Sequence, residues 1–142
     1  MKHFFLDTNV LIDFLADRRP FARDAAKLFN YSLKNELTIY VSAVSYNNIY
    51  YILKQTNSHR ATLAVLAELQ DWTTGIAVDQ QIIRNALKSD FKDFEDAIQY
   101  HSALGILQLD GIVTRETKDF KTSTLAVFTP LEAVAVMKGI LS

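Results

Sequence analysis

The stretch that decides the fold lies near the amino terminus and reads Phe4-Phe5-Leu6-Asp7-Thr8-Asn9-Val10-Leu11. Its opening, residues 3–6, is apolar or aromatic and ends at Asp7, which predicts a short buried strand that delivers an acid to the edge of a sheet. Apolar residues then recur at helical spacing through Leu15, and Pro20 follows the polar cluster that ends this helix. The stretch therefore predicts a strand followed directly by a helix.

The rest of the chain repeats this alternation. Residues typical of strands occupy 37–41, 74–78, 111–114 and 125–128, and amphipathic or capped segments predict helices at 21–33, 43–55, 58–71, 79–87, 95–108 and 130–137. Each parallel crossover needs a helix, so we expect an α/β fold, a three-layer α/β/α sandwich with a mainly parallel sheet of about five strands. A length of 142 residues suits one core, and we expect a single domain over 1–142.

Composition excludes several classes of protein. Hydrophobic residues make up 49% and charged residues 22% of the chain, which excludes a disordered tail. The chain has no cysteine, which excludes a disulfide framework and a thiolate zinc site. A net charge of −1 means that any nucleic-acid binding must come from a local patch. With no export signal and no apolar run near the roughly 20 residues that span a bilayer, we expect a cytoplasmic protein that does not enter a membrane.

Acids gather around the predicted ends of two strands. Asp7 follows the first strand, Asp93, Glu95 and Asp96 begin the helix that leads into the fourth, and Asp119 comes after the fourth. Ligands of such sheets bind outside the carboxyl ends of the strands, so we expect these side chains to converge. Converging carboxylates repel one another unless a cation joins them, and oxygen ligands suit Mg²⁺ or Mn²⁺.

Simpler interpretations of these acids stay open. Asp93 and Asp96 also suit a helix amino terminus, where acids cap the backbone and interact favourably with the helix dipole. Asp7 is open to interpretation as a cap or surface turn, and the default interpretation of Asp13 is a solvated helix face.

Four stretches resemble the motifs of PIN domains, the fold of the VapC-like toxin ribonucleases. They are residues 5–13, the segment opened by Ser42, residues 93–97 and residues 114–120, in this order along nearly the whole chain. The resemblance implies a PIN-like fold and a metal-dependent ribonuclease in which an acidic quartet holds Mg²⁺ or Mn²⁺. It gives Asp7, Asp96 and Asp119 as the matching carboxylates.

The second member of the quartet departs from the family pattern. Asn48 stands six residues after Ser42, where the pattern has Glu, and Glu116 competes with Asp119 for the last place. An amide oxygen still binds or orients a hydrated cation, but the lost charge is expected to weaken metal binding. We therefore expect Asn48→Glu to raise activity.

Neighbouring residues complete the expected site. We expect Asn9 and Thr114 to hold the site through hydrogen bonds, with Asp93 as a further supporting residue. We expect Arg115 and Lys118 to bind the phosphates of the RNA. The resemblance also implies a homodimer and, for a toxin of a toxin–antitoxin pair, an antitoxin protein as partner.

Three alternative functions are compatible with some of the same residues. The main alternative is a catalytically impaired PIN-like module that binds RNA or a protein partner, because Asn48 lacks the acidic charge. A haloacid-dehalogenase-type phosphatase also opens with a strand and Asp-x-Asp, but Asn9 stands at its second acid. A receiver-type phosphoacceptor needs a lysine at a late strand end, where Arg115 and Glu116 stand instead.

Overall fold

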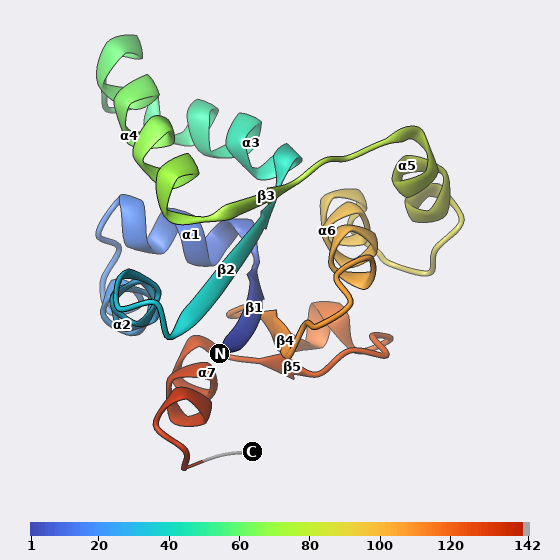
Figure 1. The fold of residues 1–142 in the computed structure, drawn as a ribbon. Helices are drawn as coiled ribbons and strands as arrows, with labels where there is room; N and C mark the ends of the chain where they lie inside the picture. Colours follow the sequence, from blue (N-terminus) through green and yellow to red (C-terminus); the bar gives the residue numbers. More distant parts are fainter. Residues whose placement is uncertain (141–142) are drawn as a thin grey trace.

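The computed structural model describes residues 1–140 and confirms the predicted α/β fold (Figure 1). Its elements in chain order are β1 Lys2–Leu6, α1 Thr8–Leu15, α2 Ala22–Leu33, β2 Leu37–Ser42, α3 Ala43–Leu53, α4 His59–Trp72, β3 Thr74–Ile76, α5 Gln80–Leu87, α6 Phe94–Leu104, β4 Gly111–Val113, the 3₁₀ turn η1 Thr117–Phe120, β5 Val127–Phe128 and α7 Pro130–Met137. The third and fifth strands and the helix before β4 are shorter than predicted, and η1 was not predicted.

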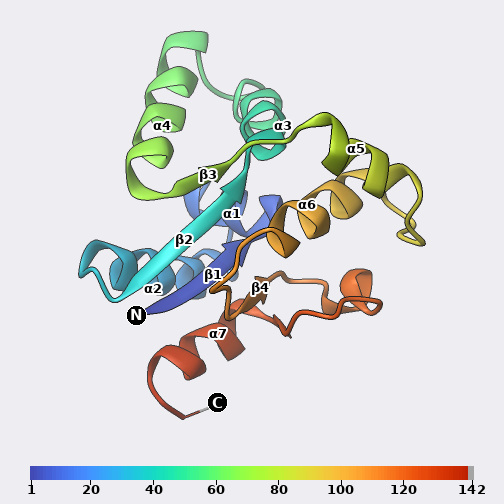
Figure 2. The same cartoon turned by 45° about the vertical axis from the view of Figure 1, so that its right-hand side comes forward.

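The five strands form one sheet in the order β3-β2-β1-β4-β5, and every neighbouring pair is parallel. On one face of the sheet lie α1, α2 and α7, and on the other lies α6 with α5 outside it (Figures 1 and 2). The helices α3 and α4 pack together at the end of the sheet next to β3. The central strand β1 therefore delivers Asp7 to the middle of the sheet's carboxyl edge.

Side chains of β1 alternate between two cores. Phe4 and Leu6 pack into the larger core beneath α1 and α2, whereas Phe5 packs with Tyr100 and Ile112 beneath α6. Successive residues of a strand point to opposite faces, and both faces of a parallel sheet are covered, so the strand has to be continuously apolar. This requirement explains the apolar opening of the chain.

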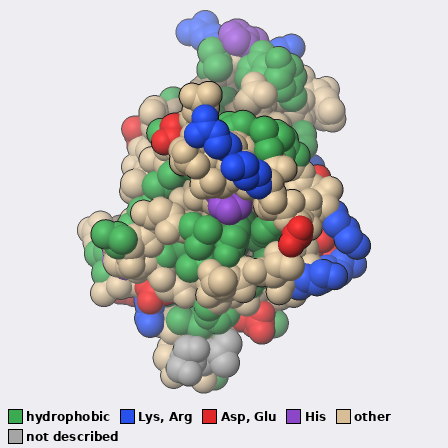
Figure 3. Space-filling model, turned by 90° about the vertical axis from the view of Figure 1, so that its right-hand side faces the viewer, with side chains coloured by type: hydrophobic (Ala, Val, Ile, Leu, Met, Phe, Trp, Pro, Cys, Tyr) green, Lys and Arg blue, Asp and Glu red, His purple; other side chains and the backbone are tan. Residues whose placement is uncertain are grey.

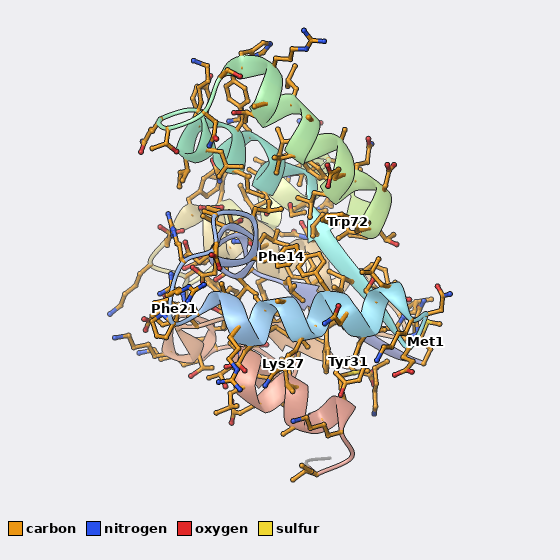
Figure 4. The ribbon with its side chains drawn as sticks, turned by 90° about the vertical axis from the view of Figure 1, so that its left-hand side faces the viewer. Met1, Phe14, Phe21, Lys27, Tyr31 and Trp72 are labelled. Atoms are coloured by element: carbon orange, nitrogen blue, oxygen red, sulfur yellow. The ribbon has the colours of Figure 1, made fainter. Side chains whose placement is uncertain are left out.

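An aromatic cluster joins α1, α2 and α4. The ring centres of Phe14 and Phe29 lie 4.1 Å apart in a stacked pair, and Trp72 meets both rings edge-on. Figure 4 shows Phe14 and Trp72 between α2 and α4. No helix within residues 1–140 combines the length and the apolar character of a membrane span.

Asp13 is not on a solvated face, so its default interpretation was wrong. Its side chain is 1% exposed and forms an ion pair with Arg115 Nε at 2.7 Å, while Arg18 lies 3.9 Å away. The guanidinium of Arg115 also sits 4.0 Å from the ring centre of Phe21. Asp13 is buried because Arg115, from the distant loop after β4, folds back over α1.

Candidate functional site

Asp7 sits where β1 ends and α1 begins. Its backbone is extended and its amide donates to the Val113 carbonyl at 2.9 Å, which continues the pairing with β4. The side chain is buried and makes no cap hydrogen bond, so the capping interpretation was wrong. Instead, Gln99 Nε2 donates to Oδ1 at 2.9 Å and Thr114 Oγ1 donates to Oδ2 at 2.8 Å. Asp7 is thus held from α6 and from the end of β4.

A second group of hydrogen bonds is centred on Thr8. Its hydroxyl donates to Glu95 Oε2 at 2.8 Å and lies 2.7 Å from the hydroxyl of Ser45, which is placed to donate to it. The amide of Thr8 donates to Gln99 Oε1 at 3.0 Å. The start of α1 is therefore bonded to side chains of both α3 and α6.

The amino terminus of α6 supplies further acids. Asp93 caps the helix by accepting from the Asp96 amide at 2.9 Å, as its simpler interpretation predicted. This cap fixes Glu95 and Asp96 in the first turn, where both are half-buried and acids are favoured by the helix dipole. Gln99 follows Asp96 by three residues and so lies on the same side of the helix.

These elements surround a cavity of about 660 Å³. Its lining residues are Asp7, Asn9, Asp90, Phe91, Lys92, Asp93, Glu95, Asp96, Lys118, Asp119, Lys121 and Thr122. The start of α6 and the turn after β4 lie on the same side of the sheet (Figure 2). Lys and Arg side chains lie beside Asp and Glu side chains at one edge of this side of the molecule (Figure 3).

Most of the predicted site residues meet in this cavity. Thr114 is fully buried behind Asp7 and contacts it directly. Asp119, rather than Glu116, is the acid after β4 that lines the cavity; Glu116 is exposed and pairs with Lys118 at 3.9 Å. Arg115 lies outside the lining because it is paired with Asp13.

Asn48 is also absent from the lining. It is half-buried on α3, one helical turn after Ser45, and it is Ser45 that reaches the start of α1. Sequence reasoning missed Ser45 and Gln99, and it gave Glu95 no role. The signal for Gln99 was a polar residue at helical spacing from Asp96 within an apolar helix face.

The acids of the cavity have raised pKa values. Burial raises the pKa of Asp7, and the charge of Glu95 adds to this effect, while the hydrogen bonds from Thr114 and Gln99 oppose it. Burial, followed by the charges of Asp7, Asp93, Asp119 and Glu95, raises the pKa of Asp96 to about 7. Both carboxylates therefore hold protons more strongly than free aspartates do.

Basic side chains do not neutralise this cluster directly. The ion pairs of residues 1–140 involve Asp13, Asp17, Asp24 and Glu116, and none involves Asp7 or another acid of the cavity. A group of carboxylates without a basic partner is the environment in which a cation binds favourably.

The donor set fits a hydrated Mg²⁺ or Mn²⁺. Within residues 1–140, no three histidine or carboxylate side chains form a ready group of ligands for one ion. Mg²⁺ does not require such a group, because it keeps several of its waters and binds through one or two carboxylates. Asp7 and Asp96 provide carboxylate oxygens, and Asp119 lies at the exposed mouth of the same cavity.

Comparisons with known proteins bear on the family and the fold of the chain. A family model described as PIN domain matches residues 3–118, and no curated protein matches the chain. A toxin–antitoxin complex from Klebsiella pneumoniae contains a chain 25% identical to this one, with a TM-score of 0.63, covering 89% of this chain and 96% of that chain.

Two further solved structures have the same fold. One is VapBC2 from Rickettsia felis bound to a DNA fragment from its promoter, with 14% identity, a TM-score of 0.62 and coverage of 88% of this chain and 96% of that chain. The other is Mycobacterium tuberculosis VapC20, described as a toxin that cleaves the sarcin–ricin loop, with 16% identity, a TM-score of 0.61 and coverage of 77% and 86%.

Proposed function

Because the chain belongs to the PIN-domain family, we propose that it is a metal-dependent endoribonuclease that hydrolyses phosphodiester bonds of RNA. The observation that carries this proposal is the buried Asp7, which lines the same cavity as Asp96 and Asp119 and forms no ion pair within residues 1–140. Mg²⁺ or Mn²⁺, when bound there, supplies charge stabilisation and a water of lowered pKa for attack on phosphorus.

The protein's own residues have separate tasks in this reaction. Asp7 and Asp96 hold the cation, and the bonds from Gln99 and Thr114 keep the Asp7 carboxylate in one orientation. Asp119, which is exposed at the mouth of the cavity, is positioned to orient a water or the cation. Loss of either hydrogen bond to Asp7 would leave its carboxylate free to turn.

Lysines at the rim bind the RNA. Lys92, Lys118 and Lys121 line the cavity, and their charges offset the repulsion between the acids and the phosphates. We assign phosphate binding to these three lysines, with Lys118 common to the sequence-based prediction. Arg115 is a weaker candidate because its guanidinium already pairs with Asp13 and stacks on Phe21.

The assembly of the protein is part of the same proposal. The Klebsiella pneumoniae structure is described as a toxin–antitoxin complex, and by analogy we propose that this chain is a toxin that binds an antitoxin. We further propose that residues 1–142 form one PIN domain and that the domain pairs as a homodimer.

One observation favours a second candidate function. No acid from α3 lines the cavity, and Asn48, at the family's acidic position, carries no charge. A PIN domain with too little charge to hold a cation would bind RNA or a partner protein without cleaving it.

RNA cleavage by the purified protein decides between the two functions. We expect single-stranded RNA to be cleaved with Mn²⁺ and to be left intact with EDTA. Asp7→Asn should slow cleavage by about 100-fold, equivalent to ~2.7 kcal/mol, because it removes a charge at the reacting centre. Glu68→Gln removes a charge from the exposed surface of α4, outside the cavity, and should cleave at the wild-type rate.

Binding of RNA without cleavage by the wild type in Mn²⁺ or Mg²⁺ would support the second candidate. Equal cleavage by wild type and Asp7→Asn would show that the site is wrong.

A further inference from the structure

Glu95 reaches from α6 across to the start of α1. Its side chain is half-buried, it lines the cavity with Asp7 and Asp96, and its Oε2 accepts from the Thr8 hydroxyl at 2.8 Å. The same hydroxyl lies 2.7 Å from Ser45 in the first turn of α3. Glu95 therefore brings a carboxylate to the place where α1, α3 and α6 meet.

The hydrogen bond to Thr8 gives Glu95 a fixed position. Adjacent residues of a helix point about 100° apart, so Asp96 and Glu95 approach the cavity from different directions. One Glu95 oxygen accepts the hydrogen bond from Thr8, and the side chain lines the cavity together with Asp7 and Asp96. The ion pairs found within residues 1–140 leave Glu95 without a basic partner.

Position 48 provides neither a negative charge nor a side chain that lines the cavity. Asn48 carries no charge and does not line the cavity, and the contact from α3 to α1 is made by Ser45 one turn earlier. Both α3, which lacks the acid, and α6, which carries Glu95, reach the Thr8 hydroxyl, through Ser45 and Glu95 respectively.

We propose that Glu95 supplies the fourth negative charge of the cation site, in place of the acid that position 48 lacks. Its hydrogen bond to Thr8 aims the carboxylate, and its charge adds to those of Asp7, Asp96 and Asp119 in attracting the cation. This inference rests on the proposed metal-dependent function and assigns a residue to it. In this proposal, the negative charge that position 48 lacks comes from Glu95, on the neighbouring helix α6.

A purely structural role for Glu95 predicts different behaviour. In such a role, Glu95 would accept the hydrogen bond from Thr8 and would interact favourably with the dipole of α6. The hydrogen bond needs only an oxygen atom, whereas the dipole interaction also uses the negative charge. Glu95→Gln keeps the shape and the accepting oxygen and removes only the charge. The variant therefore separates the hydrogen bond from the attraction of a cation.

Calorimetric titration of the full chain with MnCl₂ tests the proposal without reference to activity. We expect Glu95→Gln to raise the Kd for Mn²⁺ about tenfold, equivalent to ~1.4 kcal/mol. The control Glu68→Gln removes one charge from the exposed surface of α4, outside the cavity, and should stay within about twofold of the wild type. Asp7→Asn should abolish the binding, and far-UV circular dichroism checks that each variant is folded.

The outcomes separate this inference from the function on which it rests. Wild-type affinity in Glu95→Gln, together with lost binding in Asp7→Asn, would overturn the role of Glu95 and leave the metal site intact. Equal weakening by Glu95→Gln and Glu68→Gln would mean that the effect reflects net charge alone and would also overturn the role of Glu95. Absence of Mn²⁺ binding by the wild type would overturn both the inference and the metal-dependent function.

Relocating the charge provides a second test. Adding Asn48→Glu to Glu95→Gln returns an acid to the family's usual position, and we expect it to recover most of the lost affinity. A double variant that binds Mn²⁺ no better than Glu95→Gln would contradict the equivalence of the two positions.

Discussion

Asp96→Asn should stabilise the metal-free protein at neutral and alkaline pH. In the wild type, this carboxylate is half-buried and faces the charges of Asp7, Asp93, Asp119 and Glu95. Asn has nearly the same shape and carries no charge, so it removes both the desolvation cost and the repulsion. The variant would lose cation binding and gain free energy of unfolding.

The size of the gain follows from the pKa of Asp96, which rises from 3.8 to about 7. A difference of about three pH units corresponds to ~4 kcal/mol at ~1.4 kcal/mol per unit. Solvent screens a half-buried group, which reduces the figure to about 2 kcal/mol. Loss of a favourable acid at the start of α6 subtracts about 0.5 kcal/mol. We therefore expect a net gain of about 1.5 kcal/mol.

The gain should depend on pH with a definite sign. Because the folded-state pKa is raised, the folded protein holds a proton between about pH 4 and about pH 7 that the unfolded chain has released. Wild-type stability should fall as pH rises through this window and should level off above it. The advantage of Asp96→Asn should be near zero at about pH 4 and complete near pH 8.

Urea unfolding in EDTA, followed by Trp72 fluorescence at several pH values, measures this difference. Asp17→Asn is the matched control, since Asp17 is exposed, pairs only with Arg19 and has a positive φ of 50° that Asn accepts. We expect the control to change stability by less than about 0.5 kcal/mol at every pH. A pH-independent difference, or a destabilised Asp96→Asn near pH 8, would refute the reasoning. Mn²⁺ should stabilise the wild type and leave Asp96→Asn unchanged.

Three further predictions concern the surroundings of the site. Asp13→Asn should lower the free energy of unfolding by about 2 kcal/mol in urea titrations, because Arg115 then lacks its buried counter-charge; an unchanged midpoint would contradict this. Gln99→Leu should cost about 2 kcal/mol in the same assay, since the buried Thr8 amide loses its acceptor; a neutral effect would mean that water replaces Gln99. Lys121→Ala should weaken single-stranded RNA binding and reduce the slope of log affinity against log salt by about 0.7 in fluorescence anisotropy; an unaltered slope would remove this lysine from the phosphate contacts.

Local sequence patterns predicted the fold and several of the acids that line the cavity, among them Asp7, Asp96 and Asp119. A buried apolar strand followed directly by a helix is a local signal, and parallel strands necessarily bring their carboxyl ends to one edge. The meeting of Asp7 and Asp96 in one cavity follows from that rule. The resemblance of the motifs added the family, and the family match over residues 3–118 confirmed it.

The burial of Asp13 was decided only by the tertiary structure. Its position on α1 gave no sign of burial, because the residue that covers it, Arg115, is distant in the sequence. A helix pattern reports which residues share a face, but the partner of that face depends on how the loops return. The same limit explains why Arg115 was predicted to bind RNA although its guanidinium is turned toward α1.

The contacts of Ser45 and Glu95 with the Thr8 hydroxyl were also beyond the sequence. The hydroxyl of Thr8 meets Ser45 and Glu95 because α3 and α6 pack against the start of α1 with particular rotations. Spacing along a helix fixes side-chain directions only relative to one another, and a rotation by one residue shifts them by about 100°. The order of the motifs along the chain therefore predicts that the acids meet at one edge of the sheet. Which side chains touch there depends on how α1, α3 and α6 pack against one another.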